Sequence, residues 1–251
     1  MIQDLHSHTF YSFCGKDKPD DVIEAAIKGG IELLGICDHS YGIGYGNYEF
    51  FKSETVLRDY GRAMRRYYDH IAHVRDKYSD RIKILLGVEV CTGGHPQWGL
   101  PAAEDISFFD YCLLENLDAK DSITGGDLFA YAKRCGTPMV GIAHTNMFKF
   151  IESRGEDAYD YFCRMREQNI FWEMNVSYDS IHQYRVHQYM LDFFESEEQQ
   201  DIVRRSGVKI SIGFDGHKVE DYLPDRVKDY CHRLEALDIP MPFDKRAVSL
   251  T

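Results

Sequence analysis

The sequence alternates short, continuously apolar segments with longer segments in which apolar residues recur every three or four positions. Apolar runs of about four to eight residues are typical of parallel strands buried on both faces, and the longer periodic segments are typical of amphipathic helices. About seven β–α units result, which predicts an α/β protein with mostly parallel strands. The predicted strands cover residues 2–8, 33–37, 82–90, 111–114, 139–143, 170–174 and 208–212.

Predicted helices follow most of these strands and would form the outer layer of such a fold. The clearest is the segment 53–79, where one apolar stripe repeats at alternating spacings of three and four residues. A Gly-rich loop at 41–48 and a Gly- and Pro-rich loop at 92–101 are also predicted. The predicted helices cover residues 19–29, 53–79, 127–135, 156–167, 186–206 and 224–237.

Length and composition fit one globular domain over residues 1–251. No apolar stretch approaches the roughly 18 residues of a membrane span, and no signal peptide is apparent. The seven cysteines form no CxxC pair, which suits reduced thiols in a cytoplasmic protein. A net charge of −12 disfavours long nucleic acids and anionic membranes as partners, whereas bound cations would still permit a small anionic substrate. The oligomeric state is not indicated.

Imidazoles and carboxylates follow most of the apolar strands. In a parallel sheet the carboxyl ends of the strands share one edge, and only a closed barrel gathers all of them around one opening. We therefore expect a (β/α)7 barrel of the TIM type rather than an open sheet. A dinucleotide site has no support, because no Gly-x-Gly-x-x-Gly pattern follows the first strand. The polar residues in question are His6, His8, Asp38, His39, Glu89, His144, Asp215 and His217.

His6 and His8 are the strongest candidates for metal ligands. Side chains two residues apart on a strand point the same way, so the two imidazoles can bind one ion together, as can Asp215 and His217. If such a pair of histidines occurred by itself, the competing interpretation would be two solvated histidines at a strand end. The matching clusters elsewhere in the chain favour ligation.

Three further positions strengthen the metal hypothesis. A buried carboxylate at Glu89 needs an arginine or a metal, and a metal is favoured because one carboxylate can bridge two ions about 3.5–4 Å apart. His144 alone would be interpreted as a core histidine, but its place after an apolar strand favours ligation. Asp38 and His39 cannot both face inward on a regular strand, so we assign His39 as a ligand and Asp38 as the residue that orients it.

Five of these segments, in order, resemble the motifs of the polymerase-and-histidinol-phosphatase (PHP) family, over about residues 2–217. The resemblance implies a distorted seven-stranded βα barrel that binds two or three divalent ions (zinc, manganese or iron) at the carboxyl ends of its strands. The segments are Asp4-Leu5-His6-Ser7-His8-Thr9, Cys37-Asp38-His39, Gly87-Val88-Glu89, Ala143-His144 and Phe214-Asp215-Gly216-His217.

The resemblance also implies a ligand set for each ion. His6, His8, Glu89 and Asp215 would hold the first ion, Glu89 and His144 the second, and His39 and His217 the third. Two positions depart from the family pattern. Cys14 stands where members often have a histidine, and it either ligates a metal or is an inert buried thiol. Asp118 aligns with another family histidine and would give a harder site that suits manganese.

These residues predict a metal-dependent phosphatase of the histidinol-phosphatase type, which hydrolyses the phosphate monoester of a small metabolite with a metal-activated water. Asp215, His39 or His217 would handle the protons. Arg185, which follows a predicted strand, is the candidate for binding the anionic group of the substrate. Two alternatives are an exonuclease or nucleotide phosphodiesterase of the same family, and a catalytically silent metal-binding protein.

Overall fold

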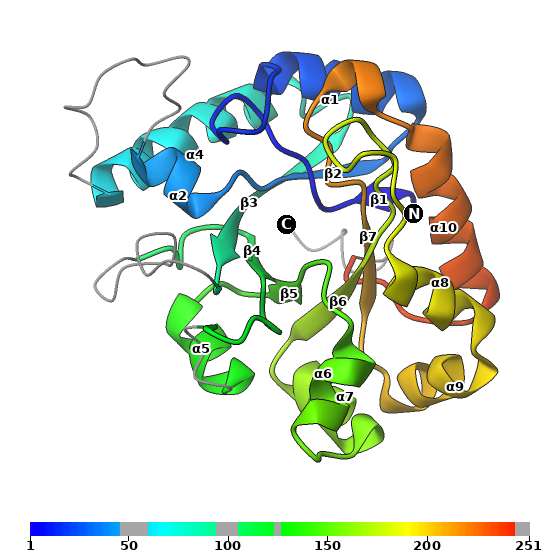
Figure 1. The fold of residues 1–251 in the computed structure, drawn as a ribbon. Coiled ribbons are helices and arrows are strands. Elements are labelled where there is room, and N and C mark those ends of the chain that lie inside the picture. Colours follow the sequence, from blue (N-terminus) through cyan, green and yellow to red (C-terminus); the bar gives the residue numbers. More distant parts are fainter. Residues whose placement is uncertain (46–59, 94–104, 123–126, 244–251) are drawn as a thin grey trace.

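The computed structural model describes residues 1–45, 60–93, 105–122 and 127–243. Seven parallel strands form one sheet in which each strand pairs with the next along the chain, and Figure 1 shows them around a central axis with the helices outside. This architecture confirms the predicted distorted, TIM-like (β/α)7 barrel. The strands are β1 (Gln3–Asp4), β2 (Leu33–Ile36), β3 (Lys83–Cys91), β4 (Tyr111–Glu115), β5 (Val140–Ile142), β6 (Ile170–Asn175) and β7 (Ile210–Gly213).

The barrel closes irregularly between its first and last strands. The amide of Leu5 donates to the carbonyl of Ile212 at 2.9 Å, and the amide of Asp215 donates to the carbonyl of His6 at 2.8 Å. β1 is shorter than predicted, because the amide of His6 donates to the carboxylate of Asp4 instead of to a neighbouring strand. The seam between β1 and β7 therefore carries two of the predicted ligands.

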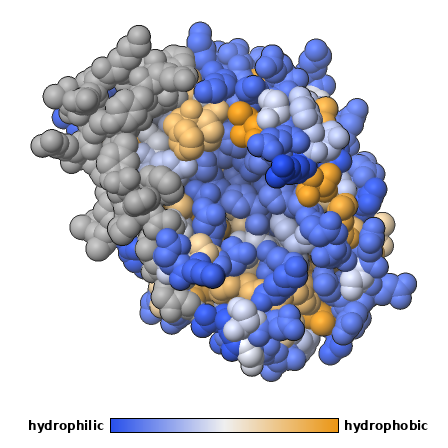
Figure 2. Space-filling model, in the orientation of Figure 1, coloured by the Kyte–Doolittle hydropathy of each residue, from blue (hydrophilic) through white to orange (hydrophobic). Residues whose placement is uncertain are grey.

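The helices cover the outside of the barrel (Figure 1). Space-filling spheres in the same orientation show a hollow near the middle of this face, lined mostly by hydrophilic residues (Figure 2). Within the described residues, no helix is long and apolar enough to cross a membrane. The helices are α1 (Pro19–Gly29), α2 (Ser40–Tyr45), α4 (Tyr60–Lys77), α5 (Leu128–Cys135), α6 (Met147–Ser153), α7 (Ala158–Glu167), α8 (Gln188–Glu195), α9 (Glu197–Ser206), the 3-10 helix η2 (Val219–Asp221) and α10 (Pro224–Ala236).

Three helical regions differ from the prediction. Residues 40–45 form α2 instead of a loop, and Gly42 allows close packing there, since a Cβ would lie 3.0 Å from the carbonyl oxygen of Tyr11. The single helix predicted at 186–206 is divided, because Ser196 ends α8 and caps α9. The short helix α6, which Asn146 caps, was not predicted.

Parts of three predicted elements lie outside the described residues. They are residues 46–48 of the Gly-rich loop, the start of the helix predicted at 53–79, and residues 94–101 of the Gly- and Pro-rich loop.

Alternate residues of β6 face two different cores. Phe171 packs with Leu5, Tyr111 and other residues inside the barrel, whereas Trp172 packs with the residues between the sheet and the helices. Glu173 follows on the inner side, so the strand pattern that buries Phe171 also brings a carboxylate into the interior of the barrel.

We expect Trp172→Ala to lower the free energy of unfolding by about 3–5 kcal/mol, the typical cost of deleting a buried aromatic side chain. Trp172 is fully buried, its ring stacks against Phe162 with centroids 5.8 Å apart, and its Nε1 donates to the carbonyl of Thr145. Urea unfolding measures the change, with Tyr184→Ala, at a 54% exposed tyrosine, as the control. A loss below 1 kcal/mol for Trp172→Ala would contradict the packing described here.

Candidate metal centre

The predicted ligands from the first and last strands converge in the buried interior. The Nε2 atoms of His6 and His8 lie 3.1 Å apart, and Nε2 of His8 lies 3.1 Å from Oδ1 of Asp215. His6 and His8 are fully buried, and Asp215 is 4% exposed. His144 and Asp215 both have positive φ angles, of 28° and 57°, a backbone conformation that is uncommon outside glycine and that occurs often at functional sites.

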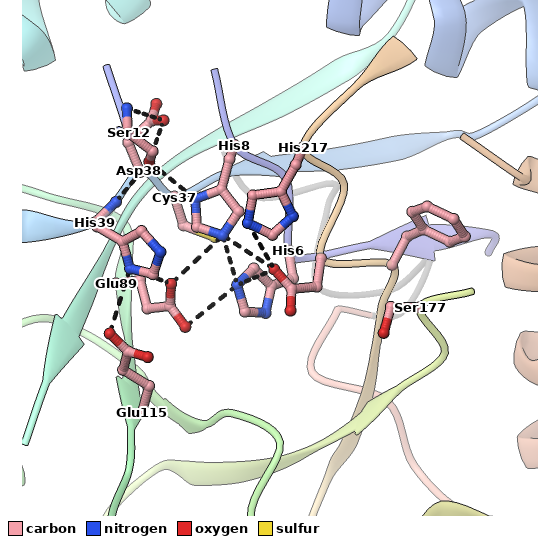
Figure 3. A network of polar contacts seen from close by, with 12 residues as sticks. His6, His8, Ser12, Cys37, Asp38, His39, Glu89, Glu115, Ser177 and His217 are labelled. Atoms are coloured by element: carbon pink, nitrogen blue, oxygen red, sulfur yellow. Dashed lines mark hydrogen bonds and ion pairs between the residues drawn. The ribbon is translucent and has the colours of Figure 1, made fainter. Parts of the chain in front are cut away.

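Glu89 links three elements of the site. Its Oε1 lies 3.3 Å from Nε2 of His6 and 3.2 Å from Nε2 of His144. Its Oε2 lies 2.8 Å from Nδ1 of His39, whose backbone forms an isolated bridge with that of Glu89. Figure 3 shows the carboxylate of Glu89 between the rings of His39 and His6, and the carboxylate of Glu115 facing the same nitrogen of His39. The position fits the bridging role that the sequence predicts for this carboxylate.

A third group gathers around His8. The rings of His39 and His217 each stack on the ring of His8 with centroids 4.5 Å apart. The thiol of Cys14 is close to the same group: burial opposes its ionisation, but hydrogen bonds to His217 and His39 outweigh burial and lower the pKa of Cys14. Cys14 therefore lies close to His39 and His217, but the donor atoms that lie within 4.8 Å of one another belong to His8, His39 and His217.

A hydrogen-bond chain behind His8 fixes its orientation. The hydroxyl of Ser12 donates to Oδ1 of Asp38 at 2.7 Å, and its oxygen accepts from the backbone N–H of His39 at 2.9 Å and from Nδ1–H of His8 at 3.0 Å. The lone pair of Nε2 on His8 then faces the cluster. Asp38 also accepts from the amide and hydroxyl of Thr9, so its carboxylate supports Ser12 and Thr9 behind His8, whereas the sequence predicts that it orients His39.

The charges of the cluster are strongly coupled. Burial by itself lowers the pKa of His6 and His39, but the nearby carboxylates raise both pKa values well above the usual range. His144 responds in the same way, with a pKa of about 9. His8 differs: burial and the charges of His217 and His39 hold its pKa well below the usual range.

The carboxylates show the complementary effect. Burial would raise the pKa of Glu89 and of Asp215, yet the surrounding imidazoles hold both values well below the usual range. The negative charges in this interior are therefore balanced by shared protons, and a divalent cation can replace those protons as the counter-charge.

The donor set fits divalent metal ions. Nδ1 of His39 and Oε2 of Glu89 are buried and, although close, have no hydrogen-bond partner of suitable geometry among the described residues; the same holds for Nδ1 of His217. Nitrogen and carboxylate donors of this mixture suit zinc, manganese and iron. Four triplets have donor atoms within 4.8 Å of one another: His8, His39 and His217; His6, His8 and Asp215; His39, Glu89 and Glu115; and Asp179, His182 and His217.

Two predicted site residues lie outside the cluster. Asp118 is exposed on the turn after β4, and Glu115, the last residue of that strand, is the carboxylate that reaches the cluster, with Oε1 at 3.3 Å from Nδ1 of His39. The sequence predicts that this strand ends at residue 114, and it therefore does not predict Glu115 as a ligand at the end of the strand. Arg185 is exposed. His182, on the same turn as Arg185, is the residue that faces the site, with Nε2 at 3.1 Å from Oδ2 of Asp215.

We expect Glu115→Gln to reduce the amount of metal that the purified protein binds, and Asp118→Asn to leave it unchanged. The first substitution removes a charged donor 3.3 Å from Nδ1 of His39, whereas the second alters an exposed carboxylate. Elemental analysis of both variants beside the wild type measures the difference. Equal metal content in Glu115→Gln and the wild type would show that Glu115 is not a ligand.

Comparison with known proteins agrees with this geometry. Residues 4–104 match the model of the PHP domain family, and His144, Asp215 and His217, which lie beyond the match, meet Glu89 in the same cluster. This match agrees with the resemblance to the PHP family that the motifs predict. The match and the fold together support a hydrolase of the phosphoesterase class. A search of curated proteins gave no match.

Solved structures are similar to this chain at low sequence identity, and the first of them shares its fold. A histidinol phosphate phosphatase from Lactococcus lactis subsp. lactis Il1403, complexed with zinc, L-histidinol and phosphate, has a TM-score of 0.57 and 15% identity, with 96% of this chain and 95% of that chain covered. A putative histidinol phosphatase from Listeria monocytogenes has a TM-score of 0.45 and 14% identity, with 87% of this chain and 96% of that chain covered. A third structure comes from a study of two metal-dependent tyrosine phosphatases, YwqE from Bacillus subtilis and CpsB from Streptococcus pneumoniae. It has a TM-score of 0.46 and 15% identity, with 94% of this chain and 87% of that chain covered.

Proposed function

We propose that this protein hydrolyses the phosphate monoester of a small metabolite, with two or three divalent ions of zinc, manganese or iron. The observation that carries the proposal is the buried carboxylate of Glu89, which lies within 3.3 Å of imidazole nitrogens of His6, His39 and His144. A carboxylate shared among several imidazoles in this way suits the bridging ligand of a multinuclear hydrolase. Bound ions of this kind supply a water of lowered pKa and polarise the phosphoryl oxygens.

The residues of the chain would then position and move protons. Oδ2 of Asp215 lies 3.1 Å from Nε2 of His182, whose side chain is 22% exposed, so this pair connects the buried cluster with the solvent side of the site. We assign proton transfer at the reacting oxygens to Asp215, and keep His39 and His217 as further candidates. No serine or cysteine nucleophile is needed.

A small substrate is supported by the site and by the charge of the protein. Most of the proposed ligands are buried, and a net charge of −12 disfavours a long polyanion. The L-histidinol and phosphate bound in the Lactococcus lactis structure make histidinol phosphate the first substrate to test. The cysteines are all free thiols, which fits a cytoplasmic location.

The test is a phosphate-release assay on protein loaded separately with Mn²⁺, Zn²⁺ or Fe²⁺. We expect release from histidinol phosphate or another small phosphomonoester, and at most slow cleavage of a dinucleotide. Faster cleavage of the dinucleotide would favour a phosphodiesterase. A metal-loaded protein that is inactive on a broad panel of phosphoesters would favour a catalytically silent metal-binding protein.

A further inference from the structure

A second buried carboxylate, Glu173, lies behind the metal centre and was not singled out from the sequence. It is the fourth residue of β6 and is fully buried on the inner side of the barrel. A carboxylate in such a place is costly unless donors surround it. Its Oε1 lies 2.6 Å from Nδ1 of His6, and its Oε2 accepts the backbone N–H of His144 at 3.0 Å. The amide of Asn175 is a weaker third donor at 3.5 Å.

The neighbouring strand leaves room for this carboxylate. Gly213 ends β7, and a Cβ at that position would lie 2.1 Å from Oε1 of Glu173 and 2.6 Å from Cβ of His6. Any larger residue at position 213 would therefore push Glu173 and His6 apart. The contact between these two side chains depends on a glycine in a third strand.

The two hydrogen bonds constrain two ligands from different strands. A carboxylate accepts hydrogen bonds, so Nδ1 of His6 keeps a proton for Glu173, and Nε2, at 3.3 and 3.4 Å from Glu89 and Asp215, is the nitrogen that can give up its proton to a metal ion. The other oxygen of Glu173 holds the backbone of His144, whose φ angle is 28°. One side chain thus sets the tautomer of one ligand and the backbone conformation of another.

We propose that Glu173 is a positioning residue for the metal centre, which acts through His6 and His144 without binding the metal itself. The inference rests on the metal centre of the proposed function and not on its substrate. Carboxylates that accept from a ligating imidazole typically contribute about 10- to 100-fold to metal affinity. Glu173 has the added feature that both of its oxygens are needed, since each accepts from a different ligand.

The substitution Glu173→Gln separates this role from simple packing. Glutamine has nearly the same shape but only one acceptor oxygen, so its NH2 group must face either Nδ1 of His6 or the amide of His144. In the first case His6 takes the other tautomer and directs Nε2–H at the cluster. In the second case the hydrogen bond to His144 is lost. Either arrangement weakens metal binding.

The experiment is a competition titration of the metal-free protein with Zn²⁺ and with Mn²⁺ against a chromophoric chelator. We expect Kd to rise about 10- to 100-fold for the tightest ion in Glu173→Gln. The metal-free variant should keep its Tm within about 4 °C of the metal-free wild type. The control is Glu167→Gln, an identical change at a glutamate whose side chain is 64% exposed, which should bind metal as the wild type does.

A second variant and a second measurement guard against a folding defect. Glu173→Asp keeps both acceptor oxygens but shortens the reach by one methylene, so it should also weaken metal binding. Histidine ¹⁵N spectra of the metal-free proteins should show that one imidazole changes tautomer or loses its hydrogen bond in Glu173→Gln.

Two results would overturn the inference. One is wild-type metal affinity in both Glu173 variants. The other is an equal fall of Tm in the metal-free and metal-loaded Glu173→Gln protein, which would show that the residue only supports the fold. A wild-type protein that binds no divalent ion would overturn the metal centre itself, and with it the proposed function. A wild-type protein that binds metal but hydrolyses no phosphoester would overturn the proposed activity alone and leave the role of Glu173 standing.

Discussion

Glu89→Gln is expected to lower kcat/KM for a phosphomonoester on the order of a thousandfold, which corresponds to several kcal/mol of transition-state stabilisation. The substitution keeps the size of the side chain but removes the charge that faces His6, His39 and His144. A neutral amide is a poor bridge between two cations, so metal content should fall together with activity. Steady-state kinetics and elemental analysis of the same preparation measure both effects.

The matched control for this prediction is Glu220→Gln, because the side chain of Glu220 is 79% exposed and its contact with Lys218 is 4.0 Å long. We expect this variant to retain the kinetics and metal content of the wild type, as exposed ion pairs contribute little. A Glu89→Gln protein with full activity would remove the main support for a metal-centred mechanism.

Removal of the bound metal with a chelator is expected to lower Tm by about 10 °C. A ligand present at about a thousand times its Kd stabilises the folded state by roughly 4 kcal/mol, and each kcal/mol shifts Tm by about 2–4 °C in a protein of this size. The physical cause is the buried cluster, where Glu89 and Asp215 face imidazoles with few other partners. Differential scanning calorimetry before and after chelation measures the shift.

Re-addition of Zn²⁺ or Mn²⁺ should restore the original Tm, which separates loss of metal from irreversible damage. Asp215→Asn supplies the comparison, since it removes one carboxylate from the centre and should shrink the response to the chelator. A wild-type Tm that is the same before and after complete metal removal would show that the ions do not stabilise this fold.

The sequence was sufficient to predict the barrel and the convergence of the ligands. Most of the short apolar strands end at an imidazole or a carboxylate, and parallel strands that close into a ring must bring those ends together. His6, Glu89 and Asp215, although widely separated along the chain, do meet. Their roles as ligands stay predictions that the experiments above test.

Other features depended on contacts that a pattern does not reveal. Asp118 aligned with a family histidine, but the turn after β4 leaves it exposed, and Glu115 reaches His39 because it still belongs to the strand. Glu173 lies in a mostly apolar strand. Its carboxylate fits inside the barrel because Gly213, in the neighbouring strand, has no side chain. Whether Glu115 and Glu173 reach the cluster depends on packing between neighbouring strands, which the order of residues along one strand does not reveal.

The seam between β1 and β7 has a consequence for how the centre assembles. His6 accepts the amide of Asp215, so donors from the two extremes of the barrel become neighbours only when the ring is complete. During synthesis, the earliest ligands to leave the ribosome must wait for about two hundred further residues before their partners arrive. We therefore expect metal acquisition to be a late event in the maturation of this chain, since a fragment that ends before β7 lacks the donors Asp215 and His217.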